Sequence, residues 1–428
     1  MRDPALFLRK LFNIAVAAAQ PANCLPDKLP DFPASGDLVV LASGKAAAAM
    51  AAATIGHYCN QDSNHLARIR GLVTTRHGYG LDVAPLDLIE AGHPVPDEAS
   101  IRAARKSLEI AASAKPGDSV LVLLSGGGSA LWSAPTPPLD LAGKQVITRK
   151  LLHSGATIAE INTVRRHLSE IKGGKLARAV TKGVPITTIA ISDVPGDDPA
   201  SIASGPTVAD PTTGAQGLAI CDHFGIEILP EVRKRLEKDK IESKIIENND
   251  FRLAATPAIA LEAAAARARE AGFAVTNIGD ALEGEARDRA REHAEKALEM
   301  AKAGRPAMLI SGGELTVTIR GNGHGGPNQE YALALAMTLQ GHPDIEAIAC
   351  DTDGADGGSG ALDDPAGAIV GPDTLLRAIA AGADPEIHLA SNNSSSFFNI
   401  LGDLVVTGPT YTNVNDFRAI MVNRKSLS

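Results

Sequence analysis

Five short apolar segments of this chain run directly into loops of serine, aspartate and glycine. They are LVVLASGK (38–45), VLVLLSGGGS (120–129), ITTIAISDVPGDD (186–198), AMLISGGE (307–314) and IEAIACDTDGADGG (345–358). In an open α/β sheet, the loops at the carboxyl ends of the strands form the ligand crevice. Glycines there let backbone N–H groups approach a ligand, and the positive end of a following helix favours phosphate. Because one loop carries a lysine and two are rich in aspartate, the pattern favours a nucleotide or phosphate site with a metal ion.

Strand and helix patterns alternate along most of the chain, which predicts an α/β fold whose first part has a parallel sheet. Strands are expected at 38–42, 69–75, 86–90, 119–124 and 185–192, and helices at 45–56, from about Pro96, and over 140–182. A charged segment, 231–250, marks the expected domain boundary. Beyond it we expect strands at 251–255 and 273–278 and helices at 257–271 and 283–303. TVTIR (316–320) alternates with a period of two and is expected to be a hairpin partner, which makes the second sheet mixed.

Composition excludes several classes of function. Aromatic residues make up only 3% of the chain, and the net charge is −9 without a basic tract, so a nucleic-acid partner is not expected. The four cysteines share no CxxC spacing and fit free thiols in a reducing compartment. No apolar run reaches about 18 residues, so no membrane span is expected, and MRDPALFLRKLFNIAVAAAQ has the pattern of an amphipathic helix. We therefore expect a soluble protein of the cytoplasm.

The first two loops are candidate anion sites. A lysine just inside a helix, as in SGK (43–45), can place its ammonium over a substrate anion, although a solvated lysine is the alternative. It is not a Walker A loop, because Val39 and Ala46 stand where Gly and Ser or Thr are required. Three consecutive glycines, Gly126–Gly128, cost more backbone entropy than a plain turn warrants, which favours a phosphate or substrate cradle. The loop does not match the dinucleotide fingerprint GxGxxG, and GxSxG is also missing.

Aspartates follow two other strands. Asp193, at a strand end, is suited to Mg²⁺, which prefers few carboxylates together with phosphate oxygens. DTDGADGGSG (351–360) begins like a calcium loop but follows a strand and lacks the glutamate that closes that pattern, so an EF-hand is rejected. Asp353 and Asp356 are candidates for metal or ribose contacts, with Asx-turn duty as the alternative.

A further charged segment is NTVRRHLSEIKGGKLA (162–177), which carries Arg165, Arg166, Lys172 and Lys175 on a predicted helix. A solvated helix face is the usual origin of such charges. The glycine pair directly after Lys172 instead indicates a helix end near a ligand. For His93 and His167 the sequence offers no partner, and a structural role is expected for both.

Six motifs together resemble a known family. SGGGSALWSAP, NTVRRHLSEIKGGKLA, ISDVPGDDPASIASGPT, SGGELTVTI, TDGADG and TGPTYTNVNDF occur in this order and resemble the glycerate 2-kinase family, the class II glycerate kinases with a C-terminal MOFRL domain. The resemblance implies transfer of the ATP γ-phosphoryl group to the 2-hydroxyl of D-glycerate, giving 2-phosphoglycerate. It also implies two three-layer α/β/α domains with the active site in the cleft between them. These are 1–245, Rossmann-like with a parallel sheet, and 250–428, with a mixed sheet.

The resemblance also implies roles for individual residues. Lys45 and Asp193 are expected to be catalytic, and Asp193 and Asp353 to hold Mg²⁺ or another divalent cation. Substrate or phosphate contacts are expected from Ser43, Gly44, Ser125, Gly126, Gly127, Gly128, Ser129, Arg166 and Lys172. Nucleotide contacts are expected from Gly312, Gly313, Glu314, Asn328, Glu330, Asp353 and Asp356. The expected partners are ATP and D-glycerate, without nucleic acid or membrane, in a chain that forms a homodimer.

Two positions depart from the family pattern. The usual GGRNQE reads GGPNQE here, so Pro327 replaces an arginine, and Tyr411 replaces a glycine in TGPTYTNV. The lost guanidinium removes a bidentate phosphate contact, for which Arg320 or His324 could substitute. Two alternatives therefore stay open. One is an NAD(P)H-dependent hydroxypyruvate reductase, a label that this family often carries, and the other is a weakened sugar-acid or nucleotide-binding protein.

Overall fold

The computed structural model describes residues 3–238, 246, 249–357, 361 and 363–423. They form two compact units. Residues Cys24–Ala254 form one, here called the central unit, and Met1–Asn23 together with Ala255–Ser428 form the other, the terminal unit.

This division corrects the boundary expected from the sequence. Residues 1–23 pack in the terminal unit, and the strand that begins at Asn249 belongs to the sheet of the central unit. The charged segment 231–250, proposed as the boundary, contributes a helix at Pro230–Lys238 to the central unit, and 239–245 and 247–248 lie outside the described residues. The apolar face of the first helix decides the difference, because it is buried against elements beyond Ala255.

The central unit is built on a six-stranded sheet with the order β3-β2-β1-β4-β5-β6. The pairs β3–β2, β2–β1, β1–β4 and β4–β5 are all parallel. The strands are β1 (Leu38–Ser43), β2 (Ile69–Arg76), β3 (Asp87–Ala91), β4 (Ser119–Leu124), β5 (Ile186–Ile191) and β6 (Asn249–Ala255). This is the order of a Rossmann fold, in which the direction of chain progress reverses between β1 and β4. The predicted Rossmann-like parallel sheet is confirmed.

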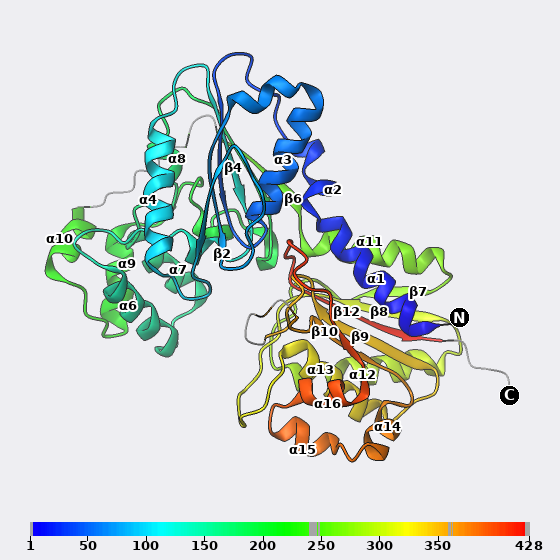
Figure 1. Ribbon diagram of the computed structural model, residues 1–428. Coiled ribbons are helices and arrows are strands. Elements are labelled where there is room, and N and C mark those ends of the chain that lie inside the picture. The colour runs from blue at the N-terminus through cyan, green and yellow to red at the C-terminus, as the bar shows by residue number, and fades with distance from the viewer. Residues whose placement is uncertain (1–2, 239–245, 247–248, 358–360, 362, 424–428) are drawn as a thin grey trace. The chain divides into compact units, whose positions relative to one another are not determined.

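Helices and turns connect these strands (Figure 1). They are η1 (Pro26–Lys28), α3 (Ala47–Gln61), η2 (Ser63–Arg68), α4 (Glu98–Ala112), α5 (Gly128–Leu131), α6 (Leu141–His153), α7 (Ile158–His167), α8 (Lys175–Ala179), η3 (Pro195–Asp197), η4 (Ile202–Ser204), α9 (Gly214–His223) and α10 (Pro230–Lys238). The stretch 140–182, expected as a helical segment broken at Gly173 and Gly174, is three helices, and the expected break lies before the third. Thr157 starts the second of them with a reciprocal capping box to Glu160, and Gly174 precedes the third in a left-handed conformation.

The terminal unit holds the second sheet, in the order β11-β10-β9-β12-β8-β7. Only β7–β8 is parallel among its paired strands, so the predicted mixed sheet is confirmed. The strands are β7 (Ala274–Asn277), β8 (Ala307–Ser311), β9 (Ile345–Asp351), β10 (Gly367–Val370), β11 (Leu404–Val405) and β12 (Asp416–Val422). The expected hairpin is wrong: TVTIR makes one bridge, from Thr316 to Glu285, and the antiparallel partner of β8 is β12.

Helices cover both faces of this second sheet, as Figure 1 shows. They are α1 (Pro4–Ala19), α11 (Pro257–Glu270), α12 (Ala286–Lys302), α13 (Pro327–Leu339), α14 (Thr374–Ala380), α15 (Pro385–Ala390) and α16 (Ser394–Leu401). The short helix α2 (Pro21–Cys24) follows α1 and ends at the first residue of the central unit. Successive side chains of β12 point to opposite faces of the sheet. Ile420 belongs to the cluster of α12 and α13, whereas the ring of Phe417 lies 6.1 Å from Phe12 of α1.

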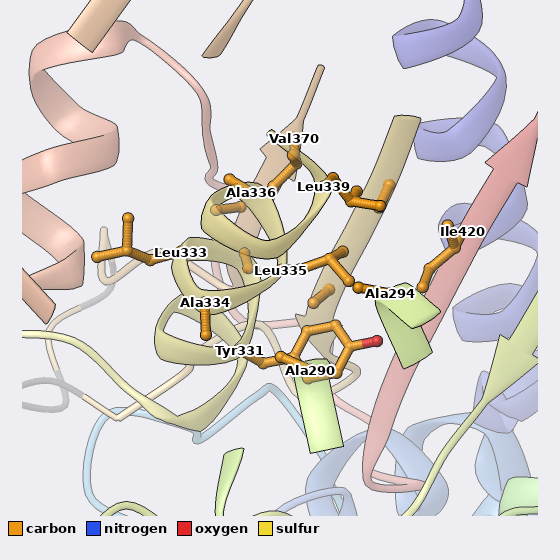
Figure 2. Packing of buried hydrophobic residues seen from close by; sticks show 14 of the residues in the cluster. Ala290, Ala294, Tyr331, Leu333, Ala334, Leu335, Ala336, Leu339, Val370 and Ile420 are labelled. Carbon is orange, nitrogen blue, oxygen red and sulfur yellow. The ribbon is translucent and has the colours of Figure 1, made fainter. Parts of the chain in front are cut away.

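Small residues let α12 and α13 pack closely. Alanines recur along the buried face of α12, including Ala290 and Ala294, and Figure 2 shows them beside Tyr331 and Leu335 of α13. The phenolic hydroxyl of Tyr331 is bonded to Nδ1 of His293 at 2.8 Å, so its one polar atom is satisfied within the core.

The N-terminal helix α1 is amphipathic, as its sequence predicts. The carboxylate of Asp3 caps it by accepting from the Leu6 N–H at 2.9 Å, and Phe7, Leu8, Leu11 and Phe12 are buried. Among the described residues, no helix combines the length and apolar character that a bilayer crossing requires.

Candidate active site

Two of the glycine loops meet where the order of the central sheet reverses. The N–H of Lys45, after β1, donates to the carbonyl of Gly126 at 2.8 Å, and the N–H of Ala46 donates to Oγ of Ser125 at 3.0 Å. A side chain on Gly44 would have its Cβ only 2.1 Å from that Oγ. The SGK and SGGGS loops are thus joined at the switch point where Rossmann-like sheets bind their ligands.

His93 lies against the second of these loops. A Cβ on Gly127, which has a φ of +83°, would lie 2.8 Å from Cδ2 of His93 and 3.5 Å from Cγ of Lys45. The sequence predicted a structural role for His93, and the structure places its ring beside the candidate anion loop. A signal was available, because His93 also follows the carboxyl end of a strand, β3.

Ser129, the last residue of the SGGGS motif, is a centre of hydrogen bonds. Its Oγ accepts from the guanidinium of Arg165 at 2.6 Å and from Nζ of Lys172 at 2.7 Å, and it lies 2.9 Å from Oγ of Ser204. The Lys172 ammonium also donates to the Ser129 carbonyl at 2.5 Å, and this lysine is only 1% exposed. Lys172 therefore reaches the predicted loop.

Lys144 of α6 adds a further cation to this group. Its Nζ lies 3.5 Å from Oγ of Ser133, and the residue is 7% exposed. Burial, together with the charges of Arg165 and Lys175, lowers the pKa of Lys144 to about 7. Burial, together with the charges of Arg165 and Lys144, holds the pKa of Lys172 well below its usual value. Neither Lys144 nor Ser204 stands out in the sequence, because long-range packing brings both to the loop.

Arg166 does not join this group. Its Nε donates to the Asp210 carboxylate at 2.9 Å. Nε2 of the adjacent His167 is hydrogen-bonded to the hydroxyl of Thr212, at 2.9 Å. Neighbouring residues on a helix point in different directions, so Arg165 rather than Arg166 faces Ser129. The contact to Ser129 is made by Arg165 of the charged segment, and the substrate or phosphate contact expected of Arg166 stays a prediction.

The loop after β5 lies on the same edge of the sheet. Asp193 is half-buried there, two residues past Ile191, the last residue of β5. Farther along, Ala203 and Ser204 have φ values of +50° and +62°, a left-handed conformation that costs non-glycine residues about 1–3 kcal/mol each. This conformation holds the Ser204 hydroxyl at Ser129, and the methyl of Ala203 fills the space in which a Cβ on Gly128 would lie.

The predicted nucleotide residues gather separately, at one edge of the second sheet. Gly312, Gly313 and Glu314 follow β8, and Asp353 and Asp356 follow β9. Between these strands, β12 begins at Asp416, and its Arg418 donates to the Gly312 carbonyl at 2.8 Å. Within the terminal unit, the fourth and fifth loops are therefore neighbours.

Asp356 caps helix α13 from inside the unit. Its two carboxylate oxygens accept from the N–H groups of Asn328 and Gln329 at 2.9 and 2.8 Å. The side-chain amide of Asn328 also bridges Asp356 and Asp416, at 3.1 and 2.6 Å. Burial, together with the charge of Asp416, raises the pKa of Asp356 to about 7, against the opposing effect of the backbone donors. Asp356 and Asn328 thus hold the start of α13, and their nucleotide contacts stay predictions.

Glu330 is also held by its own unit. It is 1% exposed, and its carboxylate binds the guanidinium of Arg287 at 2.6 Å and the amide of Asn392 at 2.9 Å. Asn392 in turn accepts from the N–H groups of Arg320 and Gly321 at 2.6 and 3.0 Å. Glu330 thus fixes the glycine-rich segment 320–326 that leads into α13.

Asp353 is a predicted metal ligand whose carboxylate also takes part in a turn. The residue is buried, and one of its carboxylate oxygens accepts from the N–H of Ala355 at 2.9 Å, which is the Asx-turn alternative foreseen from the sequence. No group of three or more His, Cys, Asp or Glu side chains within the described ranges is arranged to hold a metal ion. Asp193 and Asp353 stay predicted metal ligands.

Known proteins resemble both units of this chain. A family model described as a domain of unknown function (DUF4147) matches residues 7–237, and the MOFRL family model matches residues 307–416. The glycerate 2-kinase of Pyrococcus horikoshii is 41% identical over 92% of this chain and 89% of its own length. The chain belongs to the glycerate 2-kinase family.

Members of the glycerate 2-kinase family carry two kinds of name. A protein of Agrobacterium vitis named putative hydroxypyruvate reductase is 48% identical over 97% of this chain and 94% of its own length. The crystal structure of glycerate kinase from Thermotoga maritima superimposes with a TM-score of 0.87 at 35% identity and covers 98% of this chain and 99% of that one. The fold is therefore that of a glycerate kinase.

The two departures from the glycerate 2-kinase pattern have local explanations. Pro327 is the first residue of α13, where its missing N–H costs nothing and its fixed φ suits the helix. Tyr411 has a φ of +57°, the left-handed region in which glycine is at ease. The structure thus explains the family's glycine at position 411 and the tolerance of proline at position 327.

Proposed function

We propose that this protein is a glycerate 2-kinase, which transfers the γ-phosphoryl group of ATP to the 2-hydroxyl of D-glycerate. The observation that carries the proposal is the junction of the SGK and SGGGS loops at the switch point, with the cationic side chains of Arg165 and Lys172 bonded to Ser129. Family membership and the fold of a glycerate kinase support the same activity.

The site suits the demands of phosphoryl transfer. The transition state of this reaction is loose, so an enzyme acts mainly by positioning its substrates and neutralising charge. The Lys45 ammonium would stabilise charge near the attacking hydroxyl, and the backbone of Ser125–Gly128 would line the anionic oxygens. In the terminal unit, Gly312–Glu314 would lie along the nucleotide, and the Asp356 and Glu330 networks would hold the neighbouring loops in place.

A divalent cation would complete the charge balance. Mg²⁺ supplies electrostatic neutralisation of nucleotide phosphates and usually binds one or two carboxylates together with waters and phosphate oxygens. Asp193 suits this requirement because it is half-buried at a strand end, and Asp353 of the terminal unit is the other predicted ligand. We also propose the cytoplasm as the location, supported by four free cysteines, and a homodimer as the assembly.

The reductase alternative requires a dinucleotide site. In a Rossmann fold that binds NAD, the first βα turn carries GxGxxG and an acid at the end of a strand binds the ribose. Here the first turn reads Ser-Gly-Lys-Ala-Ala (43–47), and β2 ends at Arg76. The alternative of a weakened binding protein rests on Pro327 alone.

A coupled assay separates the three possibilities. We expect ADP release from Mg-ATP with D-glycerate, and a phosphorus NMR signal for phosphate on the 2-oxygen of the product. Oxidation of NADH with hydroxypyruvate, without ADP release, would favour the reductase. Calorimetric binding of ATP and D-glycerate without any product would favour the binding protein. A product phosphorylated on the 3-oxygen would leave the kinase class standing and overturn the regiochemistry.

A further inference from the structure

Two buried lysines and one half-buried arginine converge on the SGGGS loop from three places in the chain. Lys144 lies on α6, Arg165 on α7, and Lys172 in the turn that follows α7. Their charges are close enough to act on one another, because Arg165 lowers the pKa of both lysines and Lys144 lowers that of Lys172. Lys175 on α8 also acts on Lys144. The central unit thus concentrates positive charge beside Ser129.

These three cations bind neutral oxygens. Arg165 donates to Oγ of Ser129 and, at 3.4 Å, to the amide oxygen of Asn162. Lys172 donates to two oxygens of Ser129, and Lys144 makes one long contact to Ser133. In the part of the chain that the structure describes, none of the three is paired with a carboxylate. Arg166 is a built-in contrast, since it is adjacent on α7 and has Asp210 as its counter-ion.

Unpaired cations in a protein interior are costly. Each buried charge loses several kcal/mol of hydration, and like charges repel more strongly at low dielectric. Lysines can escape this cost by releasing their protons, but an arginine guanidinium stays charged. Loss of a proton therefore removes this cost for the buried Lys144 and Lys172 and leaves the half-buried Arg165 without a counter-charge. A bound anion would supply a counter-charge to all three.

We propose that Lys144, Arg165 and Lys172 enclose a receptor for one small oxyanion beside Ser129, supplied by the carboxylate of the acceptor acid or by a phosphate. The acid is the occupant that we favour, and this choice rests on the proposed kinase function. Lys144 is the basis for this choice, because its ammonium has three N–H donors and makes one contact within the described part of the chain, at 3.5 Å to Ser133.

Occupation of this receptor changes the protonation of the lysines. Burial and the neighbouring cations favour the neutral amine of Lys144 in the free protein above about pH 7 and lower the pKa of Lys172 as well, whereas a bound anion favours the ammonium forms. Binding above that pH is therefore accompanied by proton uptake. The affinity for the anion falls as the pH rises, by about tenfold per pH unit for each proton taken up.

Isothermal titration calorimetry tests the receptor without relying on turnover. D-glycerate, inorganic phosphate and glycerol are titrated in turn into the whole protein at pH 8, in two buffers of different ionisation enthalpy. We expect D-glycerate to bind with proton uptake and glycerol, which lacks a carboxylate, to give no signal. Phosphate binding with proton uptake, in place of glycerate binding, would support the receptor and assign it to a phosphate.

Three variants sharpen the result. Lys144→Met and Lys172→Met are each expected to reduce the proton uptake and to weaken anion binding at least tenfold. Lys150→Met, an exposed lysine on the same helix, is expected to change neither. Lys144→Met is also expected to raise Tm without anion and to reduce the rise in Tm that the anion causes, which separates a lost receptor from a lost fold.

The receptor would be overturned by anion binding without proton uptake, by equal affinities in all three variants, or by no binding of either anion. ADP release is measured on the same samples. A protein that binds glycerate as expected and releases no ADP would contradict the kinase and retain the receptor, whereas turnover with no dependence on Lys144 would contradict the receptor and retain the kinase.

Discussion

At the switch point, the main chain and the side chain of Lys45 have different roles. The main chain of Lys45 secures the junction of two loops through its N–H bond to Gly126, while its side chain extends from a half-buried position. Substitution of the side chain leaves that backbone bond in place. The chemistry of Lys45 can therefore be removed with little effect on the fold.

Lys45→Ala is expected to lower kcat/KM for D-glycerate by about 10²–10³-fold, the usual cost of removing one preorganised stabilising group. The thermal midpoint is expected to stay within a few degrees of the wild-type value, because the substitution keeps the backbone bond from residue 45 to Gly126. The coupled ADP assay and calorimetry measure the two quantities. Near-normal turnover in Lys45→Ala would remove the residue from the mechanism, and Lys150→Ala is the control for a lost lysine charge.

A substitution at position 327 tests whether the proline reduces activity. Pro327→Arg restores the residue that is usual in the family at the first position of α13, a position that accepts arginine with the loss of a favourable φ worth about 1 kcal/mol or less. A guanidinium bonded to phosphate is worth about 1.5–3 kcal/mol, so kcat/KM for ATP is expected to rise by about 10–100-fold. Pro327→Gln controls for the loss of proline. If both variants match the wild type, another group already serves the phosphate.

Helix α13 shows how an element depends on a buried acid. The N–H groups of Asn328 and Gln329 donate to the Asp356 carboxylate, and the side-chain amide of Asn328 links that acid to Asp416. The pKa of Asp356 is about 7 in the folded protein, against about 3.9 in the unfolded chain. Between these values the folded state keeps a proton that the unfolded state releases, so stability falls as the pH rises from about 4 to about 7.

Asp356→Asn removes this titration. The variant loses one acceptor for the two helix N–H groups and is expected to be less stable than the wild type at pH 4 by about 1–2 kcal/mol. The difference is expected to shrink as the pH rises toward 7, because only the wild type loses stability from this carboxyl. Urea unfolding at four pH values between 4 and 7.5 measures the trend. A constant difference across that range would contradict the shifted pKa.

The helices and strands were largely predictable from the sequence, whereas the contacts between them were not. The strand ends and their glycine loops were predictable because period, length and turn residues are local signals. The choice between Arg165 and Arg166 depends on the exact rotation of α7, and Lys144 reaches Ser133 only through the packing of α6. TVTIR has the alternation of a strand, but β12, about a hundred residues later, takes the place beside β8. Sequence patterns carry no information on such competition.

At the scale of the whole molecule, the chain enters the terminal unit twice. Residues 1–23 contribute α1, whose Phe7 and Phe12 rings lie 5.7 and 6.1 Å from Phe273 and Phe417, and the hydroxyl of Thr412 donates to the Ala19 carbonyl at 2.7 Å. An amphipathic helix at the N-terminus is visible in the sequence, but which sheet it covers is not. The order of residues along the chain therefore does not give the boundary of the unit.

The terminal unit is consequently expected to need residues 1–23 in order to fold. Burying each large apolar side chain of α1 stabilises the unit by about 1.5–3 kcal/mol, so loss of its several buried side chains approaches the whole stability of a typical domain, about 5–15 kcal/mol. Residues 255–428 expressed alone are expected to aggregate or to unfold without a cooperative transition. The same segment followed by a Gly/Ser linker and residues 1–23 is expected to give one cooperative transition by circular dichroism.

Matched substitutions in this rearranged chain show whether the helix acts through its buried face. Phe12→Ala is expected to cost about 3–5 kcal/mol and Leu6→Ala, at a position that is 64% exposed, less than about 0.5. Cooperative unfolding of 255–428 alone would contradict the assignment of α1 to this unit's core. Equal effects of the two substitutions would show that the linker, rather than the packed face of α1, restores the fold.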